Sequence, residues 1–181
     1  MKAINLLSIV CVSTFFTSCV IIRPGEVGVK QTLGKLSDKT YSQGAVWFNP
    51  FVTKVVKTNV QINDIELALS LPSKEGLSVM AQISILYRID QNSVPKVIRS
   101  IGLGYESIIS NVFRSASADV CSKYFAKDMH SGMRAEIENA IKEKMHETLQ
   151  EQGIVVSAVL MKSIQLPSHI SGGKQVVLVV Q

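Results

Sequence analysis

The stretch from Gly76 to Asp90 constrains the fold more than any other part of this chain, because its side chains alternate in character. Every odd position is apolar: Leu77, Val79, Ala81, Ile83, Ile85, Tyr87 and Ile89. The even positions are polar except for Met80 and Leu86. A period of two is typical of a strand with one buried face. A slip of one residue would expose that face, at roughly 1.5 to 3 kcal/mol for each large side chain. We therefore expect a central strand with a fixed register.

Other segments read as strands of the same kind of sheet. Val27–Leu33 and Glu66–Leu71 alternate, and Val52–Val60 is strand-like. The five residues from Pro72 to Gly76 are rich in turn formers, which predicts an antiparallel hairpin between Glu66–Leu71 and the central strand. Ile154–Leu160 is almost continuously apolar and short, which predicts a strand buried on both faces.

A loop that contains Asp38 and Gly44 is expected to lead into an aromatic segment, Val46–Phe51. Its aromatic side chains either fill the core or lie at the level of lipid headgroups, where tryptophan and tyrosine are enriched. We expect core packing and keep the headgroup position as the alternative.

After Asp90 the apolar period becomes helical. Asn92 or Ser93 is suited to cap a short helix with Pro95 in its first turn, and Gly102 and Gly104 are suited to end it. A long helix should follow from Tyr105 to Tyr124, and a second from Met133 to Leu149 with Gly153 as its stop. The second helix has a charged face, with pairs such as Glu138 and Lys142. Strands, two long helices and a returning strand together predict an α+β domain.

Nothing in the sequence indicates catalysis or a metal. The three histidines, His130, His146 and His169, lack metal-ligand spacing, and Cys121 reads as a buried thiol on a helix. The three cysteines show no CxxC spacing. We therefore expect no enzyme activity, no catalytic residue, no metal and no cofactor. The formal charge is +5, but the basic residues are scattered, which argues against nucleic acid as a partner. Attraction to anionic lipid headgroups is the second interpretation of this charge.

The N-terminus predicts attachment to a membrane. No charge occurs from Ala3 to Ile22, and Lys2 and Arg23 flank the stretch. A helix of about twenty residues spans a hydrocarbon core, but a basic start and an apolar run are also typical of a secretory signal. Phe16-Thr17-Ser18-Cys19 resembles the lipobox of bacterial lipoproteins, with Phe16 in the usual aliphatic position. Three alternatives follow: cleavage and lipidation at Cys19, an uncleaved anchor helix, or a cysteine that only packs. The first two make the protein a bacterial lipoprotein or a single-pass anchored protein.

The order of short motifs resembles the SPFH or band 7 domain of prohibitins, stomatins and flotillins, with the prohibitin-like subgroup nearest. The matching segments are Pro24–Val29, Gly44 with Asn49–Phe51, Glu75–Leu77, Tyr87–Asp90, Tyr105, Arg114-Ser115, Arg134, Gly153–Val156 and Ile164–Pro167. The resemblance implies an SPFH-like antiparallel sheet with two long packed helices over residues 24–167, after an anchor or signal segment at residues 1–22.

The resemblance also implies a function. Such proteins are membrane scaffolds that form homo-oligomers, organise membrane microdomains and in some members control a membrane-bound AAA protease, with no catalytic residues. A monomeric lipoprotein that serves as a binding module is the alternative. In the family a charged helix follows the Leu-Pro and forms a coiled coil. Residues 168–181 are instead an atypical tail with Gly172-Gly173 and a valine-rich run, so we expect the coiled coil to be missing.

Overall fold

A computed structural model describes residues 18–130 and 132–165 of the chain. The α+β class and the antiparallel sheets expected from the sequence are confirmed. The chain divides into two compact units. Within the described residues, the first unit contains residues 18–62, 88–105 and 149–155, and the second contains residues 63–87, 106–130, 132–148 and 156–165.

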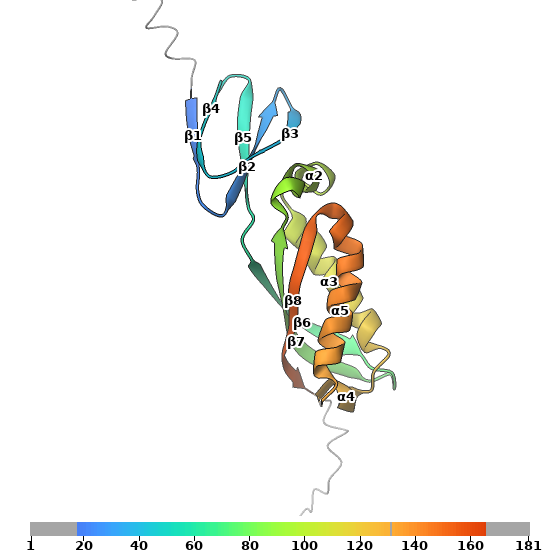
Figure 1. Ribbon diagram of the computed structural model, residues 1–181. Helices are drawn as coiled ribbons and strands as arrows, with labels where there is room; N and C mark the ends of the chain where they lie inside the picture. The colour runs from blue at the N-terminus through green and yellow to red at the C-terminus, as the bar shows by residue number, and fades with distance from the viewer. Residues whose placement is uncertain (1–17, 131, 166–181) are drawn as a thin grey trace, which may run out of the picture. The chain divides into compact units, whose positions relative to one another are not determined.

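The first unit is built mainly from two small sheets. In one, β1 (Ser18–Ile22) pairs antiparallel with β4 (Gly44–Phe48). In the other, β2 (Glu26–Thr32) lies between β3 (Lys35–Tyr41) and β5 (Thr53–Asn59). Figure 1 shows these strands in blue to cyan. Their shared core is formed by a few branched side chains that are nearly inaccessible to solvent: Ile22, Val27, Val29, Val46 and Val60.

The prediction of a loop around Asp38 was wrong, because Asp38 lies on strand β3. Thr32 pairs with Lys35, so only Leu33 and Gly34 connect β2 to β3. Both have positive φ, 49° and 85°, as the twist of a two-residue hairpin turn requires. Glycine adopts this conformation freely, whereas the β-carbon of a leucine makes it cost about 1 to 2 kcal/mol. Leu33 is therefore a strained residue in an exposed turn.

The aromatic segment does not fill the core, so the expectation of core packing was wrong. Val46 is buried, but Trp47 is 66% exposed and Phe51 is 75% exposed. The reason is the two-stranded sheet: within the described residues β4 pairs with β1 alone, and alternation turns Val46 inward and Trp47 outward. Phe51 lies beyond the end of β4, in the turn that leads to β5.

Short helices complete the first unit. Residues Gln91–Ser93 form the 3-10 turn η1, and α2 covers Val94–Ser100 with Pro95 in its first turn, as expected. Ser93 is the N-cap residue, but its hydroxyl donates to Asp90 Oδ2 at 3.1 Å and accepts no backbone N–H of the helix. The 3-10 turn η2 (Gln150–Gln152) ends at Gly153, whose φ is 85°. The backbone N–H of Asp90 donates to the carbonyl of Gly153 at 3.0 Å, which holds this turn next to η1.

The second unit has the predicted central strand. Strand β7 (Ser78–Ile89) lies between β6 (Asn63–Pro72) and β8 (Ile154–Gln165), and it pairs antiparallel with β6 from Pro72↔Ser78 to Asn63↔Tyr87. The odd-numbered positions of β7 from Val79 to Ile89, which are all apolar, are buried. Strand β8 is longer than predicted, and Leu160 is exposed, so the expectation of burial on both faces was wrong. An outer strand with helices on one side has only one face to bury.

Helices α3 (Tyr105–Cys121) and α5 (Arg134–Leu149) run beside this sheet, as Figure 1 shows. Their buried side chains recur every three or four residues, as the sequence predicted: Ile109, Phe113, Ala116, Val120, Ile137, Ile141, Met145 and Leu149. Glu138 does not form the expected pair with Lys142. Its carboxylate instead lies 3.3 Å from Arg134 Nε and accepts the backbone N–H of Met161 at 2.7 Å.

The sequence did not predict α4 (Ala126–His130), a single helical turn. Glu75 in the β6–β7 turn accepts the backbone N–H of Ala126 at 3.0 Å, and Lys74 N–H donates to the carbonyl of Tyr124 at 2.8 Å. This short helix therefore depends on a hairpin turn fifty residues earlier in the chain.

Gly153 tests how tightly the η1 and η2 turns are packed. A β-carbon added at Gly153 would lie 2.2 Å from Ser93 Cβ, whereas one added at Gly102, also at φ 85°, would meet nothing within 4 Å. We expect Gly102→Ala to lower the free energy of unfolding by about 1 kcal/mol through backbone strain alone. Gly153→Ala should cost about 1 to 3 kcal/mol more, because Ser93 must move. Urea denaturation followed by circular dichroism measures both, and equal losses would contradict this packing.

Candidate functional site

Cys19, the predicted lipidation residue, is an exposed free thiol on strand β1. It lies opposite Trp47 of β4, and Ile21 lies opposite Ala45. Because residues two apart on a strand share a face, these four side chains form one exposed surface, which we name the outer face (Cys19, Ile21, Ala45 and Trp47). Two lysines support it from β5 and β2: Lys57 Nζ donates to the carbonyl of Ile21 at 2.7 Å, and Lys30 Nζ donates to that of Trp47 at 2.9 Å.

A second exposed apolar group lies at two neighbouring turns of the same unit. Leu33 is 82% exposed in the β2–β3 turn, and Phe51 is 75% exposed after β4. With Pro50 and Val52 they border one shallow surface hollow, which Lys54 also lines. We name these four residues the apolar tip (Leu33, Pro50, Phe51 and Val52). The sequence did not predict the tip as a site. Its only local signal was a leucine before Gly34, where a hairpin turn normally has a polar residue or glycine.

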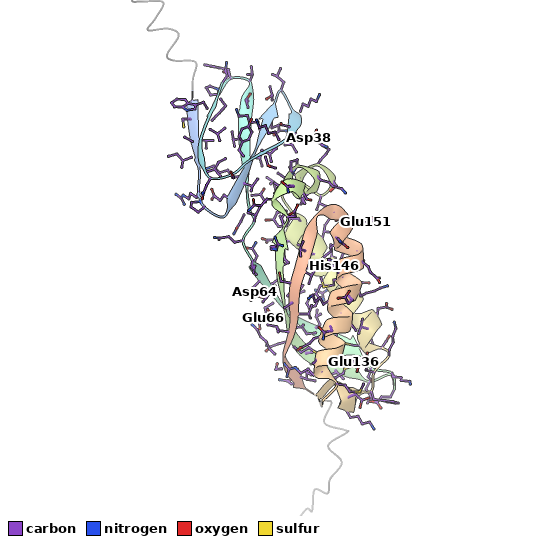
Figure 2. All side chains as sticks on the ribbon, in the orientation of Figure 1. Asp38, Asp64, Glu66, Glu136, His146 and Glu151 are labelled. Atoms are coloured by element: carbon purple, nitrogen blue, oxygen red, sulfur yellow. The ribbon has the colours of Figure 1, made fainter. Side chains whose placement is uncertain are left out.

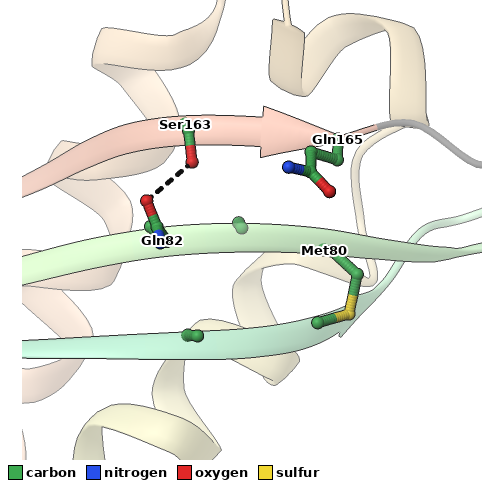
Figure 3. Close-up of a pocket in the computed structure, with 6 residues that line it drawn as sticks. Met80, Gln82, Ser163 and Gln165 are labelled. Atoms are coloured by element: carbon green, nitrogen blue, oxygen red, sulfur yellow. Dashed lines mark hydrogen bonds between the residues drawn. The ribbon is translucent and has the colours of Figure 1, made fainter.

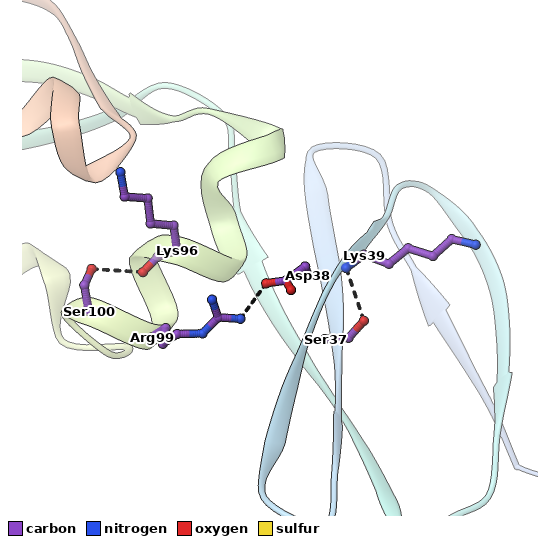
Figure 4. Close-up of polar contacts among 6 residues, drawn as sticks. All are labelled: Ser37, Asp38, Lys39, Lys96, Arg99 and Ser100. Atoms are coloured by element: carbon purple, nitrogen blue, oxygen red, sulfur yellow. Dashed lines mark hydrogen bonds and ion pairs between the residues drawn. The ribbon is translucent and has the colours of Figure 1, made fainter.

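Arg99 of α2 and Asp38 of β3 form the ion pair shown in Figure 4, with 2.6 Å between Arg99 Nη2 and Asp38 Oδ1. The hydrogen bond from Arg99 lowers the pKa of Asp38, so this carboxylate stays charged. Lys96, one helical turn before, donates to the carbonyl of Glu151. These exposed contacts join α2 to its neighbours within the first unit, and an exposed pair contributes little to stability.

Two acidic residues on β6 of the second unit have polar partners within the same sheet. Figure 2 labels Asp64 and Glu66, two residues apart on β6. Asp64 accepts the hydroxyl of Ser84, and Glu66 lies 2.6 Å from Lys162 Nζ, where its hydrogen bond raises the pKa of Lys162. A carboxylate that acts as a general acid or base must face a substrate, whereas Asp64 faces a serine on β7 and Glu66 faces a lysine on β8. Among residues 18–130 and 132–165, no three His, Cys, Asp or Glu side chains come together as metal ligands.

A surface hollow on the second unit is also lined by few groups that could take part in catalysis. Figure 3 shows it beside β7 and β8, with Met80, Gln82, Ser163 and Gln165 around it. The Ser163 hydroxyl donates to Gln82 Oε1 at 3.0 Å in this hollow. None of these side chains titrates near neutral pH, so none of them is an acid or base that could activate the Ser163 hydroxyl.

Cys121 is the second described thiol, and its position at the end of α3 is fully buried, as the sequence predicted. Burial raises its pKa from the ordinary 9.0 to about 11. A thiol is nucleophilic only as the thiolate, so Cys121 is inert at neutral pH. His146 is half-buried on α5, while the side chain of His130 and all of His169 lie outside the described residues.

The pKa of Cys121 predicts a pH dependence of stability. The unfolded chain loses this proton near pH 9 and the folded chain only near pH 11, so the free energy of unfolding should fall as pH rises through that window. The two-unit shift corresponds to roughly 2 to 3 kcal/mol at most. We expect urea denaturation at pH 8 to 11 to give a steeper decline for the unaltered chain than for Cys121→Ala. Parallel declines would show that the thiol titrates normally.

No helix within the described residues is long and apolar enough to cross a membrane. Most of the predicted signal or anchor segment, residues 1–17, lies outside the described residues, and its last five residues form β1. The atypical tail at residues 168–181 also lies outside them.

Comparison with known proteins agrees with the resemblance drawn from the sequence. A search of curated proteins found no match. The family described as SPFH domain / Band 7 family matches residues 20–173, most of the 181-residue chain. Members of this family are in general membrane-associated, non-catalytic scaffolds. The match begins within β1 and extends beyond the end of β8, so it includes both units. The chain belongs to the SPFH domain / Band 7 family.

Proposed function

We propose that this protein is a membrane-attached scaffold of the prohibitin-like subgroup, which oligomerises, organises membrane microdomains and modulates a membrane-bound AAA protease. One observation carries the attachment: Cys19 is exposed on the first strand of the SPFH domain. A lipid on this residue would tether the folded domain directly to a bilayer, with no linker between them. The protease and the microdomains rest on the family resemblance alone.

The length of the apolar stretch supports cleavage before Cys19. With Ser18–Ile22 in strand β1, the uncharged residues before the domain number fifteen, positions 3–17. A spanning helix needs about twenty residues, whereas the apolar core of a signal peptide has about 7 to 15. The remaining segment therefore has the length of a signal. Cleavage at the lipobox would leave Cys19 as the N-terminal residue, and the exposed thiol would be free to carry acyl chains.

Acylation at Cys19 would supply a strong anchor. Each buried CH₂ contributes about 0.8 kcal/mol, and stable attachment needs about two lipid signals. The acylated cysteine of a bacterial lipoprotein carries more than one chain. The resulting attachment does not require a transmembrane helix, which agrees with an SPFH domain whose first strand begins at the anchor.

The sheet of the second unit supports oligomerisation. Its outer strands β6 and β8 are 10 and 12 residues long, and each has a neighbour on one side only among the described residues. Long outer strands present unpaired backbone groups that pair readily with another chain. A second copy is the partner that the family resemblance implies.

Lipidation predicts a defined mature N-terminus. We expect the protein extracted from bacterial membranes to begin at Cys19 and to carry acyl chains on intact-mass spectrometry. Cys19→Ser should abolish labelling with an alkyne fatty acid and leave Met1 in place, because the lipobox requires the cysteine thiol. Cys121→Ser is the matched control and should label normally, since that thiol is buried. An intact Met1 on the unaltered protein would refute lipidation.

Scaffolding predicts a large assembly. After mild detergent extraction, native size-exclusion chromatography with light scattering should give a species many times the 19.8 kDa chain mass. An AAA protease of the same membrane should co-elute with it. A monomer under these conditions would overturn the scaffold proposal and favour the alternative, a monomeric lipoprotein that serves as a binding module.

A further inference from the structure

We propose that the apolar tip (Leu33, Pro50, Phe51 and Val52) inserts into the headgroup region of an anionic bilayer as a second membrane contact beside Cys19. This inference rests on the proposed membrane attachment and names the surface that meets the lipid. Leu33 and Phe51 are the two most exposed large apolar side chains among the described residues, at 82% and 75%.

Leu33 is the residue whose position is hardest to explain by folding alone. It has φ 49°, the one positive φ among described residues other than glycine, and its side chain packs little against the protein. Asparagine or glycine would relieve the strain and remove an exposed apolar group. A residue that costs backbone strain and gains no burial is expected where its side chain serves binding.

The tip is held in one arrangement by backbone contacts. The N–H of Leu33 donates to the carbonyl of Val52 at 2.9 Å, which joins the β2–β3 turn to the chain before β5. Asn49 Oδ1 accepts the N–H of Phe51 at 3.0 Å and fixes the turn that presents this aromatic ring. The two turns that present Leu33 and Phe51 are therefore fixed before the tip meets lipid.

The strand register places the tip at the end of the unit where Cys19 lies. Ser18 pairs with Phe48, which directly precedes the Asn49–Val52 turn, and Cys19 pairs with Trp47. Thr32, next to Leu33, pairs with Thr53 of β5. The chain thus enters the domain beside the tip, so any lipid anchor at Cys19 brings the tip to the same membrane.

Charge around the tip favours anionic lipid. Residues 18–62 contain six Lys or Arg and two Asp or Glu, a formal +4, and Arg99 pairs with one of those carboxylates, Asp38. Lys35 follows the β2–β3 turn, and Lys54 lines the hollow between the tip residues. Basic residues next to inserted apolar side chains are typical of binding to anionic headgroups.

A bilayer fits the tip better than a protein partner does. Stable protein interfaces bury about 800 Å² on each side, which two short turns do not offer. Interfacial insertion needs only a few aromatic and aliphatic side chains when a covalent anchor is adjacent. A second copy or another protein docked on the tip is therefore an alternative outcome of the test below.

The test uses Trp47, the single tryptophan of the chain, in full-length protein reconstituted into vesicles. Phosphatidylcholine vesicles with and without 30% phosphatidylglycerol carry a brominated lipid that quenches tryptophan on contact. We expect quenching in the anionic vesicles and at least a twofold weaker quenching for Leu33→Asn/Phe51→Ser.

Leu33→Asn alone should raise or preserve the melting temperature, because asparagine tolerates the left-handed turn. Leu103→Asn, at a leucine 62% exposed between α2 and α3, is the matched control and should quench normally.

The outcomes separate this inference from the proposed function. If the unaltered chain fails to float with vesicles, membrane attachment fails and the tip with it. If it floats but Leu33→Asn/Phe51→Ser leaves quenching unchanged, the tip does not enter lipid, and only this inference is overturned. Lys35→Gln/Lys54→Gln should abolish the difference between anionic and neutral vesicles, and a difference that persists would refute headgroup recognition by these lysines. Loss of self-association in the tip variant with unchanged quenching would instead indicate docking of a second copy.

Discussion

The burial of one face of β7 is the constraint on which the second unit depends. The apolar positions from Val79 to Ile89 are excluded from water, which fixes the register against β6 and leaves the other face to polar contacts. On that face Ser84 meets Asp64, and Gln82 meets Ser163. The same constraint brings the β6–β7 turn to Ala126, where Glu75 starts α4. These side chains are hydrogen-bonded within the second unit, so their contacts connect the strands of the sheet to one another and the β6–β7 turn to α4.

The elements that the sequence predicted are those whose apolar period is long enough to identify them. Strand β7 and helices α3 and α5 each bury many side chains at regular spacing, and these were anticipated within a few residues. Strand β3 was missed because Lys35–Tyr41 is mostly polar and pairs with β2 through its backbone. The turn α4 was missed because its start is satisfied by Glu75, a residue distant in sequence. Local sequence patterns do not identify hydrogen-bond partners that lie far away in the chain.

One part of the candidate site was predicted from the sequence and another part was not. Cys19 was identified because the lipobox is a local pattern, and its exposure on β1 agrees with that role without testing it. The apolar tip was not predicted, since hydrophobicity alone favours burial of Phe51. Among the described residues β4 pairs with β1 alone, which leaves Trp47 exposed, and Phe51 lies in the turn after β4; this topology cannot be deduced from the residues themselves.

The two units therefore differ in what they require from their surroundings. The second unit buries most of its large apolar side chains, and its exposed ones, such as Met80 and Leu160, are no more than half exposed. The β-strands of the first unit share a small core of valines and isoleucines. The same unit exposes Ile21, Leu33, Trp47 and Phe51, and Leu33 lies in a strained turn. Each of these features costs free energy in water. A lipid surface removes apolar side chains from water, so contact with a bilayer would offset these costs in the same unit that contains Cys19.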